Sequence, residues 1–108
     1  MERGGRNDSE EVCELALNFV AGEYKVKSQD LQSIAISLPL NVRWAKQVLA
    51  FLLRKECNVP CLQAAAYLGY GDSSLGYAIN QIERKMKGSI QIRDEINNVR
   101  TRFREKRA

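Results

Sequence analysis

Apolar side chains recur every three to four residues along most of this chain, the spacing that gathers them on one side of an α-helix. The first such segment contains Val12, Ala16 and Phe19, and acidic residues occupy its first turn, where the positive end of the helix dipole favours them. Capping residues and glycines divide the pattern into separate helices. The predicted elements are a helix from Asp8 or Ser9 to Gly22, a short element that Ser28 caps, a helix that Asn41 caps and that runs through Lys55, and helices over about 61–68, 72–86 and 89–104.

No segment alternates apolar and polar residues in the manner of a β-strand, and we find no internal repeat or low-complexity stretch. At 108 residues the chain has the length of one compact domain. We therefore predict an all-α fold, a compact bundle of about five to six helices that contains a helix-turn-helix. The helical domain is expected over residues 9–104, with a flexible segment over 1–8 and a basic tail over 105–108. The uncharged segment 33–41 is expected to be a connector or a packed loop.

Two of the longer helices have an apolar side that we expect to be buried and a polar side that we expect to face water. In the central helix the inward residues are Trp44, Val48 and Phe51 or Leu52, and in the last helix they are Ile90, Ile92, Ile96, Val99 and Phe103. The residues of the central helix expected to face water are Arg43, Lys46, Gln47, Arg54 and Lys55.

A short alanine-rich segment, a glycine turn and a longer amphipathic helix follow one another in the middle of the chain. Pro60 fits the beginning of the alanine-rich helix, because the first helical turn does not need the N–H group that proline lacks. Gly69 can end that helix in the left-handed conformation, which leaves residues 69–71 as a tight turn of about three residues. This order of elements is typical of a helix-turn-helix, in which the second helix reads DNA.

The predicted helix over 72–86 separates into two sides at about 100° per residue. Asp72 is expected to cap its first turn, because a carboxylate there can accept hydrogen bonds from free N–H groups. The side expected to face the core contains Leu75, Ala78, Ile79, Ile82 and Met86, and the opposite side contains Ser73, Tyr77, Asn80 and Arg84, with Ser74 and Gln81 at its edge.

The polar side of this helix carries groups suited to duplex DNA. Hydroxyl and N–H groups at a helix N-terminus bind phosphate oxygens, amide side chains pair with adenine, and a guanidinium binds guanine or phosphate. A purely structural interpretation has Tyr77 packed on a neighbour and the two amides merely solvated. The candidate residues that face the groove are Ser73, Ser74, Tyr77, Asn80, Gln81 and Arg84, and those that contact phosphates or steer DNA are Arg43, Lys46, Arg54 and Lys85.

Positive charge is concentrated in the second part of the chain. Residues 1–42 contain four Lys/Arg and seven Asp/Glu, a net −3, whereas residues 43–108 contain thirteen and six, a net +7. Clustered cations favour a polyanionic partner because they release counterions from a phosphate backbone; a solvated basic surface is the alternative. The cations near the C-terminus are expected to match the helix dipole and to add non-specific DNA affinity: Arg100, Arg102, Arg104, Lys106 and Arg107.

Other classes of function lack the residues that they need. No apolar run is long enough to span a bilayer, and the N-terminus has no signal or transit pattern, so we expect a cytoplasmic protein. Cys13, Cys57 and Cys61 are expected to be free, buried thiols, and without histidine we expect neither a metal nor a cofactor. Asp94 and Glu95 are expected to be solvated, no small-molecule substrate is indicated, and we predict that the protein is not an enzyme.

Three segments together resemble a known family. They are Phe19 to Leu31 (FVAGEYKVKSQDL), the helix from Arg43-Trp44-Ala45 to Glu56, and Tyr67-Leu68-Gly69 through Asp72-Ser73-Ser74-Leu75 to Ile82-Glu83. In order and spacing, residues 11–104 resemble the C-terminal DNA-binding domain of the bacterial replication initiator DnaA, a Trp-repressor-like helical fold. Related domains also occur in transposases that act on repeated palindromic sequences.

This resemblance implies a cytoplasmic bacterial protein that binds double-stranded DNA in replication or transcription regulation, with the helix from Asp72 in the major groove. It matches Ser73 and Ser74 to the family's hydroxyl pair and Arg43 to an arginine that begins the long helix. The chain has Tyr70-Gly71-Asp72 where the family commonly has Arg-Asp-His, and an uncharged segment where the family has an arginine-rich loop. These differences favour the alternative, a degenerate helix-turn-helix domain that binds a protein partner and little DNA.

Overall fold

The computed structural model describes residues 8–33 and 38–107, apart from the side chains of Asp8, Ser9 and Asp72. The described residues form helices and contain no strand, which confirms the all-α class and the expected number of helices. In chain order the elements are α1 (Asp8–Tyr24), α2 (Ser28–Leu31), α3 (Leu40–Phe51), the π-helix η1 (Leu52–Glu56), α4 (Cys61–Leu68), α5 (Asp72–Gly88) and α6 (Ile90–Arg107).

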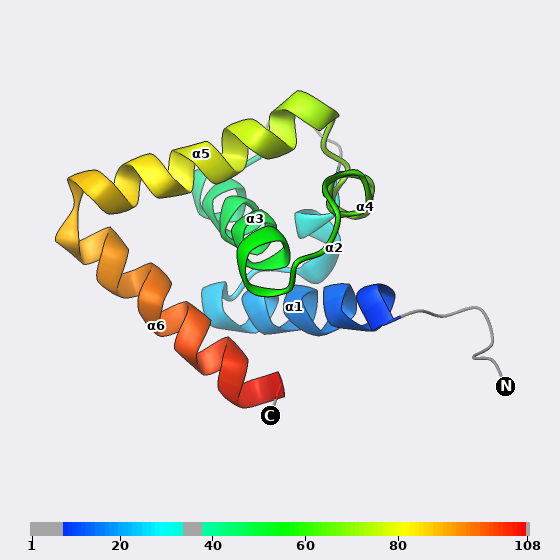
Figure 1. The fold of residues 1–108 in the computed structure, drawn as a ribbon, viewed down its shortest axis with the longest axis horizontal. Coiled ribbons are helices and arrows are strands. Elements are labelled where there is room, and N and C mark those ends of the chain that lie inside the picture. The colour runs from blue at the N-terminus through cyan, green and yellow to red at the C-terminus, as the bar shows by residue number, and fades with distance from the viewer. Residues whose placement is uncertain (1–7, 34–37, 108) are drawn as a thin grey trace, which may run out of the picture.

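Helix α3 is the centre of the bundle. In Figure 1, α5 crosses one side of α3 and α1 crosses the opposite side, while α6 descends from the end of α5 toward α1. The apolar stripe of α3 is buried as predicted at Val48 and Phe51, whereas Trp44 is half-buried. Phe103 of α6 packs against Phe19 of α1 with ring centroids 5.3 Å apart, so the first and last helices join the core together.

Several helix ends differ from the prediction by one to three residues. The first helix does not end at Gly22 but continues to Tyr24, and Lys25 follows in the left-handed conformation (φ 55°). Asn41 does not cap the central helix, because the helix already begins at Leu40, after Pro39. Ser28 is the first residue of α2 and not its cap. The side chains of the expected caps Asp8 and Ser9 lie outside the described atoms, as do residues 1–7 and 34–37.

The helix predicted to run through Lys55 changes its hydrogen bonding at Leu52 and finishes as a π-helix. Asn58 follows with φ 56°, and the Nη1 atom of Arg54 donates a hydrogen bond to the carbonyl of Val59 at 2.7 Å. Arg54 is therefore half-buried and holds the connection to α4, where solvent exposure was expected. The wider helical turn also positions Glu56, whose carboxylate faces α6.

The connection between α4 and α5 agrees with the prediction. Gly69 has φ 73°, a left-handed conformation that costs glycine little, and the N–H of Tyr70 donates to the carbonyl of Ala65 at 2.9 Å. Residues 69–71 join the two helices. Helix α5 begins at Asp72, whose predicted capping side chain lies outside the described atoms. It buries Leu75, Ala78 and the next two predicted core residues, Ile79 and Ile82, and half-buries Met86.

Helix α6 extends to Arg107, three residues beyond the predicted end. Ser89 precedes its first residue and caps it, because the N–H of Ile92 donates to the Oγ atom of Ser89 at 3.3 Å. Ile96, Val99 and Phe103 are buried, but Ile90 is 67% exposed, so its predicted burial is wrong. None of the described helices is both long enough and apolar enough to cross a bilayer.

Candidate nucleic-acid interface

Helix α5 presents a continuous polar side to solvent. Four buried residues on its other side anchor it against α3, α4 and α6. Because those anchors repeat at helical spacing, the polar residues between them must point outward. Of the predicted groove-facing residues, Gln81 is half-buried and the rest are exposed: Ser73, Ser74, Tyr77, Asn80 and Arg84.

The beginning of α3 lies beside this polar side and forms a groove with α5. The groove has a volume of about 390 Å³ and brings Arg43 together with Tyr77, Gln81 and Lys85, four of the predicted site residues. The other lining residues, Leu40, Trp44 and Gln47, were not among the site residues predicted from the sequence. None of these seven residues is acidic, so the charge of the groove comes from Arg43 and Lys85.

A second hollow lies at the N-terminal end of α5. Its volume is about 300 Å³, and Arg43, Ser74 and Tyr77 line it together with the turn residues Gly69, Tyr70 and Gly71. Free N–H groups and the positive end of the helix dipole make the start of a helix favourable for an anion. The hydroxyl of Ser74 and the guanidinium of Arg43 thus lie beside the start of the helix.

Lys46 lines the same hollow but is only 5% exposed, so the expectation that it faces water is wrong. Its Nζ atom donates a hydrogen bond to the carbonyl of Ser33 at 2.6 Å and lies 4.6 Å from the centre of the Tyr70 ring. Burial lowers the pKa of Lys46 and raises the pKa of Tyr70 to about 12. These contacts hold the turn before α5 against α3, and they make Lys46 a positioning residue for the hollow.

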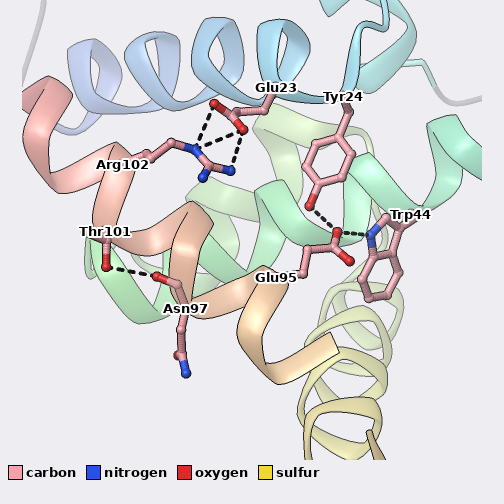
Figure 2. A network of polar contacts seen from close by, with 7 residues as sticks. All are labelled: Glu23, Tyr24, Trp44, Glu95, Asn97, Thr101 and Arg102. Atoms are coloured by element: carbon pink, nitrogen blue, oxygen red, sulfur yellow. Dashed lines mark hydrogen bonds and ion pairs between the residues drawn. The ribbon is translucent and has the colours of Figure 1, made fainter. Parts of the chain in front are cut away.

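Trp44 is fixed in the wall of the groove by a carboxylate that lies far from it in the chain. Its Nε1 atom donates to the Oε2 atom of Glu95 at 2.9 Å, and the hydroxyl of Tyr24 donates to the same oxygen at 2.6 Å (Figure 2). Burial, followed by the hydrogen bond to Glu95, raises the pKa of Tyr24. Glu95 is therefore half-buried, and the expectation that it is merely solvated is wrong. The Nζ atom of Lys85 lies 5.9 Å from the centre of the indole ring.

The arginines of α6 make ion pairs within the protein. Arg102 binds Glu23 of α1, with an Nη2 to Oε1 distance of 2.7 Å (Figure 2). Glu56 binds two arginines, Arg100 through Nε at 2.8 Å and Arg104 through Nε at 2.5 Å. The bonds to Arg104 and then to Arg100 lower the pKa of Glu56, although burial opposes the shift. The expected contribution of these three cations to DNA affinity is thus reduced by their carboxylate partners.

In the part of the chain that the structure describes, no three His, Cys, Asp or Glu side chains converge to hold a metal. Cys13 is buried as expected, Cys57 is half-buried, and Cys61 is exposed, which contradicts its predicted burial. Burial raises the pKa of the Cys13 thiol and raises that of Cys57 to about 11. A raised pKa disfavours the thiolate, the nucleophilic form of cysteine.

No model of a known protein family matches this chain, and a search of curated proteins finds no match either.

Proposed function

We propose that this protein is a sequence-preferring double-stranded DNA-binding domain in which α4 and α5 act as a helix-turn-helix. The observation that carries the proposal is the exposed polar side of α5, next to a groove whose charged lining residues, among those that the structure describes, are the cations Arg43 and Lys85. The buried anchors of α5 and the packed turn before it support a rigid helix, and a rigid helix can enter the major groove without a large loss of conformational entropy.

The length of α5 divides the roles of its side chains. Ser73 and Arg84 are eleven residues apart, or roughly 16 Å along the helix axis. The major groove is about 12 Å wide, so the helix cannot place both ends on base edges when it crosses the groove. We assign base contacts to Tyr77, Asn80 and Gln81 in the middle of the helix, and phosphate contacts to the hydroxyls at its start and to Arg84 at the far rim.

The beginning of α3 supplies the second contact surface. Arg43 and Lys85 border one groove with Trp44, so a phosphate strand that follows α5 would pass over the indole ring. This protein has a single tryptophan. DNA binding should therefore change its fluorescence, which gives a direct readout at the proposed interface.

The proposed location and biological process rest on the resemblance to the C-terminal domain of DnaA. This resemblance supports a cytoplasmic bacterial protein that acts on DNA in replication or in transcription regulation. Lys46 and Arg54 have no direct contact with DNA in this proposal, because both side chains are engaged within the protein.

Selection from a random duplex pool, followed by binding measurements on the selected site, tests the proposal. Asn80→Ala should weaken binding to that site by roughly 5- to 150-fold and relax the preference at one base pair, because a bidentate contact to adenine is worth about 1–3 kcal/mol. Asn18→Ala, which makes the same change at an exposed position of α1, is the matched control and should bind like the parent. A pool that yields no preferred sequence, or an Asn80→Ala variant with unchanged affinity and preference, would contradict the proposal.

One observation favours a second candidate, a protein-interaction module. Leu40 is 76% exposed and Tyr77 is 62% exposed, and both line the same groove. Exposed apolar groups beside each other are more typical of a protein interface than of a phosphate-binding surface. Weak binding to duplex DNA with little dependence on salt would support this candidate over the first.

A further inference from the structure

A second basic groove lies on the other flank of α5, where the end of α3 and η1, the end of α5 and the beginning of α6 meet. Its volume is about 460 Å³, within the range of roughly 300–1,000 Å³ that is usual for ligand sites. Successive residues of a helix point about 100° apart, so Glu83 in this groove and Gln81 in the DNA interface face nearly opposite directions. The two grooves share no lining residue: this one is lined by Phe51, Lys55, Glu83, Met86, Lys87, Arg93 and Arg100.

Two of the four cations that line this groove have a carboxylate partner, and the other two have none among the described residues. Lys55 pairs with Glu83 at 3.2 Å, and Arg100 pairs with Glu56 at 2.8 Å. Lys87 and Arg93 are exposed, and neither has an ion pair or hydrogen bond to a described side chain. Two unneutralised cations on facing helices therefore border the groove, one in the last turn of α5 and one in the first turn of α6.

The groove also has an apolar floor. Phe51 lines the groove but is only 3% exposed, and Met86, which also lines it, is half-buried. The guanidinium of Arg100 lies 5.5 Å from the centre of the Phe51 ring and is held there by Glu56. Methionine can adapt its shape to different occupants because its side chain is flexible and polarizable. The groove thus offers an adaptable apolar side chain in Met86, a small exposed part of Phe51, and two cations at the edge.

A duplex DNA backbone fits this arrangement poorly, because it presents phosphates but no apolar group to cover the floor. We propose that the groove is a docking site for an acidic, amphipathic segment of a partner protein. Its carboxylates pair with Lys87 and Arg93, and one large apolar side chain packs on Phe51 and Met86. This site is separate from the DNA interface, so the domain can hold DNA and a partner protein at the same time.

The test is selection of random peptides displayed on phage against the full chain. The enriched peptides should combine Asp or Glu with a large apolar residue, and a synthetic, fluorescently labelled copy should bind the parent. The double variant Lys87→Glu/Arg93→Glu should bind that peptide at least tenfold more weakly, and the copy with Ser in place of the apolar residue should also lose affinity. The matched control is Lys27→Glu/Lys106→Glu, which reverses two exposed charges outside the groove and should bind like the parent.

Unfolding curves for both double variants check that the fold is retained, and Lys87→Ala/Arg93→Ala replaces the groove variant if the reversed charges destabilise it. Enrichment without acidic residues, equal affinity of parent and groove variant, or displacement of the peptide by random duplex DNA would each overturn the proposal. Failure of this test leaves the selection of duplex sequences unaffected, and the groove variant should retain the affinity of the parent for the selected duplex.

Discussion

The salt dependence of DNA binding tests whether the fold reduces the number of cations that reach the phosphates. Residues 43–108 contain thirteen Lys and Arg residues. The structure engages six of them: Lys46 is buried, Arg54 binds a carbonyl, and Lys55 and three arginines of α6 bind carboxylates. The other seven are exposed and make no ion pair with a described residue, although Arg43 donates a hydrogen bond to the carbonyl of Leu38 at 3.4 Å. Three of these seven lie on or beside the polar side of α5, namely Arg43, Arg84 and Lys85.

The number of cations that contact phosphates sets the slope of the logarithm of the DNA-binding constant against the logarithm of the salt concentration. Each neutralised phosphate contributes about −0.9 to this slope for duplex DNA. Three phosphate contacts give a slope of about −2.7, so the affinity should fall about 40-fold between about 50 mM and about 200 mM salt. Seven contacts would give a slope of about −6. Removal of one contact, as in Arg84→Ala, should bring the slope to about −1.8.

Fluorescence anisotropy of a labelled duplex at several salt concentrations measures both slopes, and Trp44 fluorescence provides an independent readout at the interface. The variant Lys27→Ala is the control, because that exposed cation before α2 lies outside the proposed interface and should leave the slope unchanged. A slope near zero would refute DNA binding through this surface. A slope of about −6, or an equal change in Arg84→Ala and Lys27→Ala, would refute the assignment of the contacts to α5 and the start of α3.

Three further predictions concern the stability that supports the interface. Glu56→Gln should lower the free energy of unfolding by about 1 kcal/mol at neutral pH, because the carboxylate binds two partly exposed arginines of α6. Since the folded-state pKa of Glu56 is depressed, this contribution is present above the unfolded pKa of about 4.3 and is lost as the pH falls through the folded value, so urea unfolding of parent and variant should converge in acid. Glu95→Ala should cost about 1–3 kcal/mol and shift the Trp44 emission, whereas Glu95→Gln keeps an acceptor for the indole and for the hydroxyl of Tyr24; equal losses in the two variants would argue against the shared hydrogen bonds. Gly76→Ala in α5 should raise the thermal stability by about 0.5–1 kcal/mol, since an added methyl group meets no atom within 4 Å, and a lower melting temperature would count against a straight helix there.

Structural features that depend only on residues close together in the chain were predictable from the sequence. The spacing of Leu75, Ala78, Ile79 and Ile82 identified the buried side of α5 correctly, because an α-helix turns by a constant angle whatever it packs against. Gly69 identified the end of α4 for a similar local reason, since the left-handed conformation there costs glycine little. The outward direction of the polar residues of α5 follows from the same periodicity.

Contacts between residues far apart in the chain were decided only by the tertiary structure. Periodicity indicates which side of a helix faces inward, but it does not say which helix covers that side or how far a long side chain reaches. Lys46 thus lies on a side that the pattern assigned to water, and its ammonium group is buried against the carbonyl of Ser33 and the ring of Tyr70. Glu95 reaches Trp44 across 51 positions of sequence. The sequence alone therefore predicted the helices and most of their buried sides, whereas the packing of the helices determined which cations are paired within the protein, because charge is neutralised by proximity in space.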